Sequence, residues 1–188
     1  MPIFAMALVP EGNIIRTLRK TSSMQLDRGD SSDASALPEG IYLGFFSQAK
    51  SGRQENLIRE FRKSADNLFA GLPPQLRFSS CEFTGNRWYI VPDVALSTDL
   101  AMAAAAIAAR AGFAPIKKAP LLAGRGFFAG NNVTPPPFDA FSFRHLDALL
   151  YRIESAGDSF DKAWWTVLAR ASRRTGPRSS SPRGPSML

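Results

Sequence analysis

The 188-residue chain is poor in the side chains on which many enzyme sites depend. Its one cysteine, Cys81, excludes an internal disulfide framework and a cysteine metal cluster. Its one histidine, His145, excludes any site that is built from two imidazoles. The sequence also contains no Ser-His-Asp set and no glycine-rich nucleotide fingerprint. We therefore expect no bound metal and no cofactor.

Long apolar runs are missing as well. The longest, Leu100 to Ala109, is too short and too rich in alanine to span a bilayer. The first eleven residues have no basic residue ahead of their apolar run, which argues against a secretory signal. We therefore expect a cytoplasmic protein without a membrane span, and a single cysteine agrees with a reducing compartment.

The net charge of +7 is concentrated near the end of the chain. Residues 170–188 carry five arginines and no acid, whereas residues 1–169 carry 18 basic and 16 acidic side chains. The Ser-, Pro- and Arg-rich composition predicts a disordered tail over 170–188 that follows one folded domain over 1–169. With Arg173, Arg174 and Arg178, this tail could face RNA or a membrane surface, and a merely solvated terminus is the alternative.

The folded part divides into two halves with a similar order of elements, about 1–70 and 76–128. Leu8-Val9-Pro10-Glu11 in the first half recurs as Ile90-Val91-Pro92-Asp93 in the second. The spacing of apolar residues predicts strands at 2–9, 40–47, 76–83, 87–91, 120–128, 138–154 and 163–168, and helices at 12–23, 53–69 and 97–111. This internal repeat predicts a duplicated, two-lobed α+β architecture.

Three segments resemble those of the 2H phosphoesterases, a group that includes bacterial 2′-5′ RNA ligase-like proteins and RNA cyclic phosphodiesterases. Phe4–Pro10 is similar to the opening strand of that family, Phe83–Ile90 to its middle hairpin, and Leu149–Phe160 to its closing segment. The resemblance implies an α+β fold of two pseudo-symmetric lobes, each an antiparallel sheet with helices packed outside, and a central cleft.

The resemblance also implies two His-x-Thr/Ser motifs that face each other across this cleft, one imidazole acting as general base and the other as general acid on a phosphodiester. The matching positions are Ile41 and Leu43 in one half, and Leu121 and Ala123 in the other. All four polar groups are absent there. We therefore expect no catalytic residues and an apolar cleft floor, which would disfavour a phosphate.

Several residues remain candidates for ligand binding. Lys117, Lys118 and Arg125 bracket the second degenerate motif, and Arg53 follows the first. They could attract a phosphate, or they could be ordinary surface charge. The aromatic residues Trp88 and Tyr89 could stack on bases or pack in the core. Trp164 and Trp165 should point to opposite faces of a strand, so we expect at least one of them to be exposed, which would suit an interface with a protein partner.

Three functions stay open from the sequence. The first is a non-catalytic binding or interaction module for RNA, a nucleotide phosphate or a protein. The second is a phosphodiesterase or 2′-5′ ligase that uses other residues, for which His145 and Glu82 are the only acid and base to name. The third is a structural or assembly protein without a small ligand.

Overall fold

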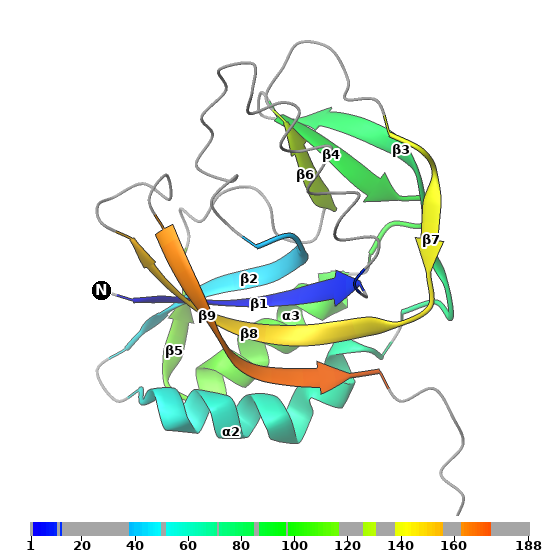
Figure 1. Ribbon diagram of the computed structural model, residues 1–188. Coiled ribbons are helices and arrows are strands. Elements are labelled where there is room, and N and C mark those ends of the chain that lie inside the picture. The colour runs from blue at the N-terminus through cyan, green and yellow to red at the C-terminus, as the bar shows by residue number, and fades with distance from the viewer. Residues whose placement is uncertain are drawn as a thin grey trace, which may run out of the picture.

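The computed structural model describes residues 2–10, 12, 38–49, 52–70, 72–84, 87–96, 98–116, 126–130, 138–155 and 163–173. Two antiparallel sheets form its frame (Figure 1). The five-stranded sheet has the order β5-β2-β1-β8-β9, and the four-stranded sheet has the order β6-β4-β3-β7. The four-stranded sheet lies on one side of the five-stranded sheet, and the helices lie on the other (Figure 1). This arrangement confirms the α+β fold of two sheets that the sequence predicted.

The centre of the five-stranded sheet is β1 (Ile3–Pro10), which pairs with β2 (Ile41–Gln48) and with β8 (Leu146–Ser155). Seven of the eight residues of β1 are buried, as expected for a central strand with both faces covered. The edges are β5 (Phe113–Pro115), which the sequence did not predict, and β9 (Ala163–Ser172).

The four-stranded sheet is built on a hairpin of β3 (Leu76–Thr84) and β4 (Arg87–Pro92), in which Thr84 pairs with Arg87. Its edge strands are β6 (Phe127–Gly130) and β7 (Phe141–Phe143). The chain passes from β7 directly into β8, so this connection joins the two sheets (Figure 1). Phenylalanines fill one face, where Phe78 contacts Phe127, Phe141 and Phe143 at centroid distances of 5.1–5.3 Å.

Helix α2 (Gln54–Ser64), its short continuation η2 (Ala65–Leu68) and α3 (Thr98–Arg110) cover the other face of the five-stranded sheet. Apolar residues at helical spacing form the contact: Leu57, Phe61 and Leu68 from the first helix, and Ala104, Ile107 and Ala108 from α3. They pack with Phe4, Met6 and Leu8 of β1 into the main core. Burial of this amphipathic face explains why both segments are helical.

Regular structure extends further along the chain than the sequence suggested. Strand β9 continues to Ser172, and Arg173 donates hydrogen bonds to the carbonyl oxygens of Pro73 and Leu72 at 2.7 and 2.8 Å. The prediction of a disordered segment from residue 170 is therefore wrong for residues 170–173, because β8 supplies backbone partners for them. Arg174 and Arg178 lie outside the described residues, as does the predicted helix at 12–23 except for Gly12.

Candidate functional site

The space between the two sheets is filled by a cluster of buried side chains, which we call the inter-sheet cluster. It consists of Ala5, Ala7, Val9, Tyr42, Phe45, Tyr89, Val91, Tyr151 and Ile153, each at most 8% exposed. The five-stranded sheet supplies seven of these residues, and β4 supplies Tyr89 and Val91. All three tyrosines of the chain lie here. The cluster is therefore apolar except for its phenol groups.

An irregularity in the pairing of β1 with β2 determines which residues of β2 enter this cluster. Ala5 pairs with Phe45 and Ala7 pairs with Tyr42, so Leu43 is an extra residue on β2. Because directly paired residues share a face of the sheet, Tyr42 and Phe45 both point to the inter-sheet side. Their rings stack at a centroid distance of 5.0 Å.

This register corrects the expectation for Ile41 and Leu43. Both are buried in the main core on the helix-covered face, at 0% and 2% exposure, so they do not line the space between the sheets. The expectation failed because the face on which each residue of β2 lies depends on its pairing with β1, and the extra residue Leu43 changes that face within the strand. The residues of β2 that do face this space are Tyr42 and Phe45, neither of which is an imidazole.

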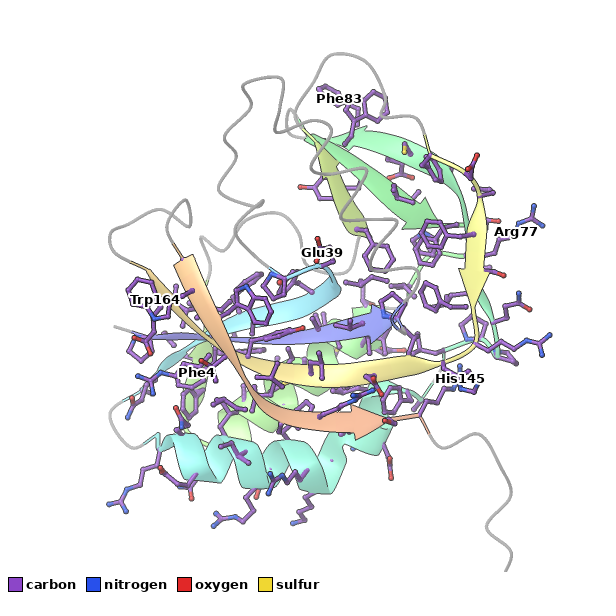
Figure 2. All side chains as sticks on the ribbon, viewed as in Figure 1. Phe4, Glu39, Arg77, Phe83, His145 and Trp164 are labelled. Carbon is purple, nitrogen blue, oxygen red and sulfur yellow. The ribbon has the colours of Figure 1, made fainter. Side chains whose placement is uncertain are left out.

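Tyr42 is a buried titratable group of the inter-sheet cluster whose pKa is strongly perturbed. Its hydroxyl donates a hydrogen bond to the carbonyl oxygen of Pro38 at 2.5 Å. Burial raises the pKa of this phenol well above its usual range, and the nearby Tyr151 and Glu39 raise it further. Glu39 lies at the start of β2, on the side of the four-stranded sheet (Figure 2). Tyr42 therefore stays a neutral hydrogen-bond donor and is unsuited to act as a base.

Among the basic candidates outside the tail, only Arg53 belongs to the described residues, and it does not lie at this cluster. Arg53 is exposed and precedes α2, the helix on the other face of the five-stranded sheet, so the structure does not bring it to the inter-sheet side. Lys117, Lys118 and Arg125 lie outside the described residues, as do the second pair of degenerate positions, Leu121 and Ala123. Their role as phosphate ligands stays a prediction.

The two aromatic residues of the middle hairpin point to opposite faces of β4. Tyr89 is 1% exposed in the inter-sheet cluster, so packing is confirmed for it and base stacking would require the cluster to open. Trp88 is partly buried on the other face and contacts Phe83 at a centroid distance of 5.1 Å. Phe83 is 50% exposed, near the turn of the hairpin (Figure 2).

The two groups named for an alternative acid and base are far apart. His145 is exposed at the bend between β7 and β8 (Figure 2). His145 lies two residues after Phe143, which pairs with Leu76 at the start of β3. Glu82 lies six residues further along β3, away from this end. At about 3.3 Å per strand residue, this separates His145 from Glu82 by roughly 20 Å. The structure does not bring them together on one substrate.

A cavity of about 380 Å³ lies on the inter-sheet face of the β3–β4 hairpin. Its lining comprises Ser80, Glu82, Val91, Pro92, Asp93, Ala95 and Leu96. Two carboxylates and no basic side chain make this lining unsuitable for a phosphate. The sequence did not indicate this cavity, because the irregularity in β3 that turns Ser80 and Glu82 toward the same side as Val91 has no clear sequence signal.

Asp93 holds this irregularity in place. Its Oδ1 accepts hydrogen bonds from the backbone N–H of Ser79 at 2.9 Å and from the Ser79 hydroxyl at 2.7 Å. Ser79 is the residue of β3 that is skipped where the pairing passes from Phe78 to Ser80. One carboxylate oxygen therefore satisfies the backbone donor that the irregularity leaves without a ladder partner. The sequence showed the Pro-Asp pair but not this contact.

Other functional groups are few in the part of the chain that the structure describes. No group of three or more His, Cys, Asp or Glu residues there could hold a metal ion. The thiol of Cys81 is partly buried, and this burial raises its pKa to about 11. A thiol with this pKa is a poor nucleophile near neutral pH, because little thiolate is present.

Two solved structures resemble the architecture of this chain. The crystal structure of E. coli LigT complexed with NADP+ superposes with a TM-score of 0.52 at 12% identity, over 92% of this chain and 97% of that chain. The apo form of E. coli LigT superposes with a TM-score of 0.48 at 13% identity, over 93% and 100%. The chain has a LigT-like fold.

This fold is consistent with the two-lobed architecture of the 2H phosphoesterases. No protein-family model matches the chain, and no curated protein matches it in sequence. Within the described residues, no helix combines the length and apolar character that crossing a membrane requires.

Proposed function

We propose that this chain is a non-catalytic, 2H phosphoesterase-like binding protein for RNA or nucleotides. One observation carries the proposal: the inter-sheet cluster contains hydrocarbon and neutral phenols, and the single histidine of the chain is exposed at the β7–β8 bend. The family reaction needs one imidazole to accept a proton and a second to donate one. Loss of a general acid or base slows such a reaction by roughly 10²–10⁴-fold, so loss of both leaves no evident catalytic route.

The likeness to LigT supports a nucleotide as the ligand. That protein was crystallised with NADP+, and this chain covers almost all of its length with a similar fold. Within the described part of this chain, the lining of the cavity on the hairpin is acidic. The basic candidates Lys117, Lys118 and Arg125, together with the arginines after residue 173, are therefore the groups that would attract phosphates.

The first experiment measures turnover of a 2′,3′-cyclic nucleotide by the full chain. We expect no turnover above that of the buffer. Turnover that His145→Ala abolishes would show that the protein is an enzyme with a non-standard site. Turnover that co-purifies with the chain but is unchanged by His145→Ala would also overturn the proposal, because other residues of the chain would then carry the reaction.

The second experiment measures binding of a short single-stranded RNA and of NADP+ as a function of salt. Neutralising Arg174, Arg178 and Arg183 to glutamine should weaken RNA binding and reduce the slope of log K against log salt by up to about 2, at about 0.7 for each phosphate that is no longer neutralised. The matched control replaces Arg59, Arg62 and Lys63 on α2 by glutamine, which removes the same charge elsewhere. Equal effects of both triple variants, or no binding at all, would contradict the proposal.

A protein-assembly role has its own support. All nine residues of the inter-sheet cluster are buried, so this part of the space between the sheets is filled rather than open. Three of the exposed large apolar side chains, Trp164, Trp165 and Val167, lie instead on β9. Exposed apolar surface of this kind often marks a protein interface.

A further inference from the structure

The exposed edge of the five-stranded sheet is unusually apolar. Strand β9 pairs only with β8 among the described residues, so its outer edge presents backbone N–H and C=O groups without a partner strand there. Trp164, Trp165 and Val167 of this strand are 56%, 38% and 45% exposed. Within the described part of the chain, the strand therefore combines backbone groups that lack a partner strand with exposed hydrocarbon.

Natural edge strands usually carry charged residues or proline that prevent pairing with another strand. Residues 163–169 of β9 contain no charged residue, no proline and no glycine. Trp165 pairs with Ile153 and Trp164 pairs with Glu154, so the two tryptophans point to opposite faces of the sheet. A ligand on one face could cover only one of them. A strand added at the edge would contact both.

The charges next to this edge are already neutralised within one copy of the chain. Arg170 pairs with the buried Asp147, and Arg152 Nε lies 2.9 Å from Glu154 Oε1. Because residues 163–169 carry no charge, two copies that pair over this segment place no like charges opposite each other within it, although the chain as a whole has a net charge of +7. This neutral edge favours a second copy as the partner.

The sequence of the edge is also complementary to itself. In an antiparallel pair that is centred on Thr166, Trp165 of each copy lies opposite Val167 of the other, and Thr166 lies opposite itself. Aromatic with β-branched pairs and threonine pairs are among the favourable cross-strand combinations. The register of β9 against β8 shifts after Val167, which bends the strand and confines the matching segment to about residues 163–169.

We propose that two copies of this chain pair through antiparallel β9 edges about a two-fold axis at Thr166, which joins their five-stranded sheets into one sheet of ten strands. Two-fold dimers are the commonest closed assemblies. From the side-chain sizes, the exposed parts of the two tryptophans and Val167 amount to roughly 300 Å² in each copy. Two copies would bury roughly 600 Å² from these side chains alone, which is about half of the roughly 1,200 Å² at the lower end of stable interfaces, so the paired backbone edges and flanking residues must supply the rest.

Sedimentation velocity of the full chain over a range of concentrations tests this proposal. We expect a monomer–dimer equilibrium that Val167→Lys weakens at least tenfold, because the ammonium group would be buried against the partner strand. Met102→Lys is the matched control, since Met102 is 66% exposed on α3, outside this edge. Circular dichroism should show that both variants keep the fold.

The position of the axis has a separate test. With Cys81→Ser in both proteins, Thr166→Cys should form an intermolecular disulfide under mild oxidation, because residues that lie opposite each other have Cα atoms about 4.5–5.5 Å apart. Met102→Cys should stay monomeric. A wild-type chain that is monomeric up to about 200 µM, or equal association of Val167→Lys and Met102→Lys, overturns the dimer. A dimer that Thr166→Cys does not cross-link overturns the axis. Neither result bears on nucleotide binding.

Discussion

Arg173 reaches back one hundred residues along the chain to Pro73. Its Nη1 donates a hydrogen bond to the Pro73 carbonyl oxygen at 2.7 Å, and its Nη2 donates another to the Leu72 carbonyl oxygen at 2.8 Å. The backbone N–H of Arg173 also donates to the Leu146 carbonyl oxygen at 3.1 Å. One residue thus joins the end of β9 to the segment that enters the four-stranded sheet.

Replacing Arg173 by alanine should lower the free energy of unfolding by about 1–3 kcal/mol, because hydrogen bonds from a charged donor are stronger than neutral ones. Arg173→Lys should recover part of this loss, since an ammonium group can reach only one of the two carbonyl oxygens well. The measurement is urea unfolding followed by circular dichroism. Arg59→Ala serves as the control, because Arg59 is 69% exposed and its nearest carboxylate oxygen is 4.0 Å away. If the two alanine variants have equal stability, the contact at Arg173 contributes nothing.

The phenol of Tyr42 should make stability depend on pH in the alkaline range. Tyr42→Phe removes its hydrogen bond to Pro38 and should cost about 1 kcal/mol at pH 7. The folded pKa of Tyr42 is raised, so its stabilising contribution is complete below the unfolded value near 10 and falls as the pH rises beyond it. The stability difference between wild type and variant should therefore shrink between pH 9 and 11. A constant difference over this range in urea unfolding would show that the phenol does not stay neutral.

Gly126 lies where the backbone of the chain approaches β4 most closely. A Cβ atom at this position would collide with the carbonyl oxygen of Ile90, and φ is +157°. Gly126→Ala should therefore destabilise the fold by about 2–4 kcal/mol, because the backbone must move to relieve the contact. Gly12→Ala is the matched control, since a Cβ there would meet no atom within 4 Å. Thermal unfolding of both variants decides the matter, and a Gly126→Ala protein as stable as Gly12→Ala would contradict the observed approach of the two segments.

Much of the secondary structure could be predicted because it depends on local patterns. The strands around Met6 and Phe78 and the helix around Phe61 were expected within a few residues of their observed bounds, since apolar spacing and flanking prolines mark them. Strand β5 was missed because three residues are too few to show a pattern. Strand β9 was expected to end at Leu168, because the arginines and serines that follow it resemble a disordered tail.

The candidate site could be predicted only in outline. The absence of a second histidine was decided by composition, but the face on which each residue of β2 lies was not. The extra residue Leu43 places Tyr42 and Phe45 on the same side of the sheet, although they are three positions apart. A strand read by simple alternation cannot reveal this, because the irregularity arises from pairing with β1. The same limit applies to Ser79 in β3.

The sequence by itself determined that a site built from two imidazoles is excluded, because the chain has a single histidine. It also determined most of the order of strands and helices, β5 excepted, since local apolar periodicity indicates which segments can bury a face. Only the tertiary structure decided that the three tyrosines meet between the sheets, that His145 lies apart from Glu82, and that Trp164 and Trp165 remain exposed on an edge strand. These relationships depend on strand order and register, which arise from contacts between residues far apart in the chain.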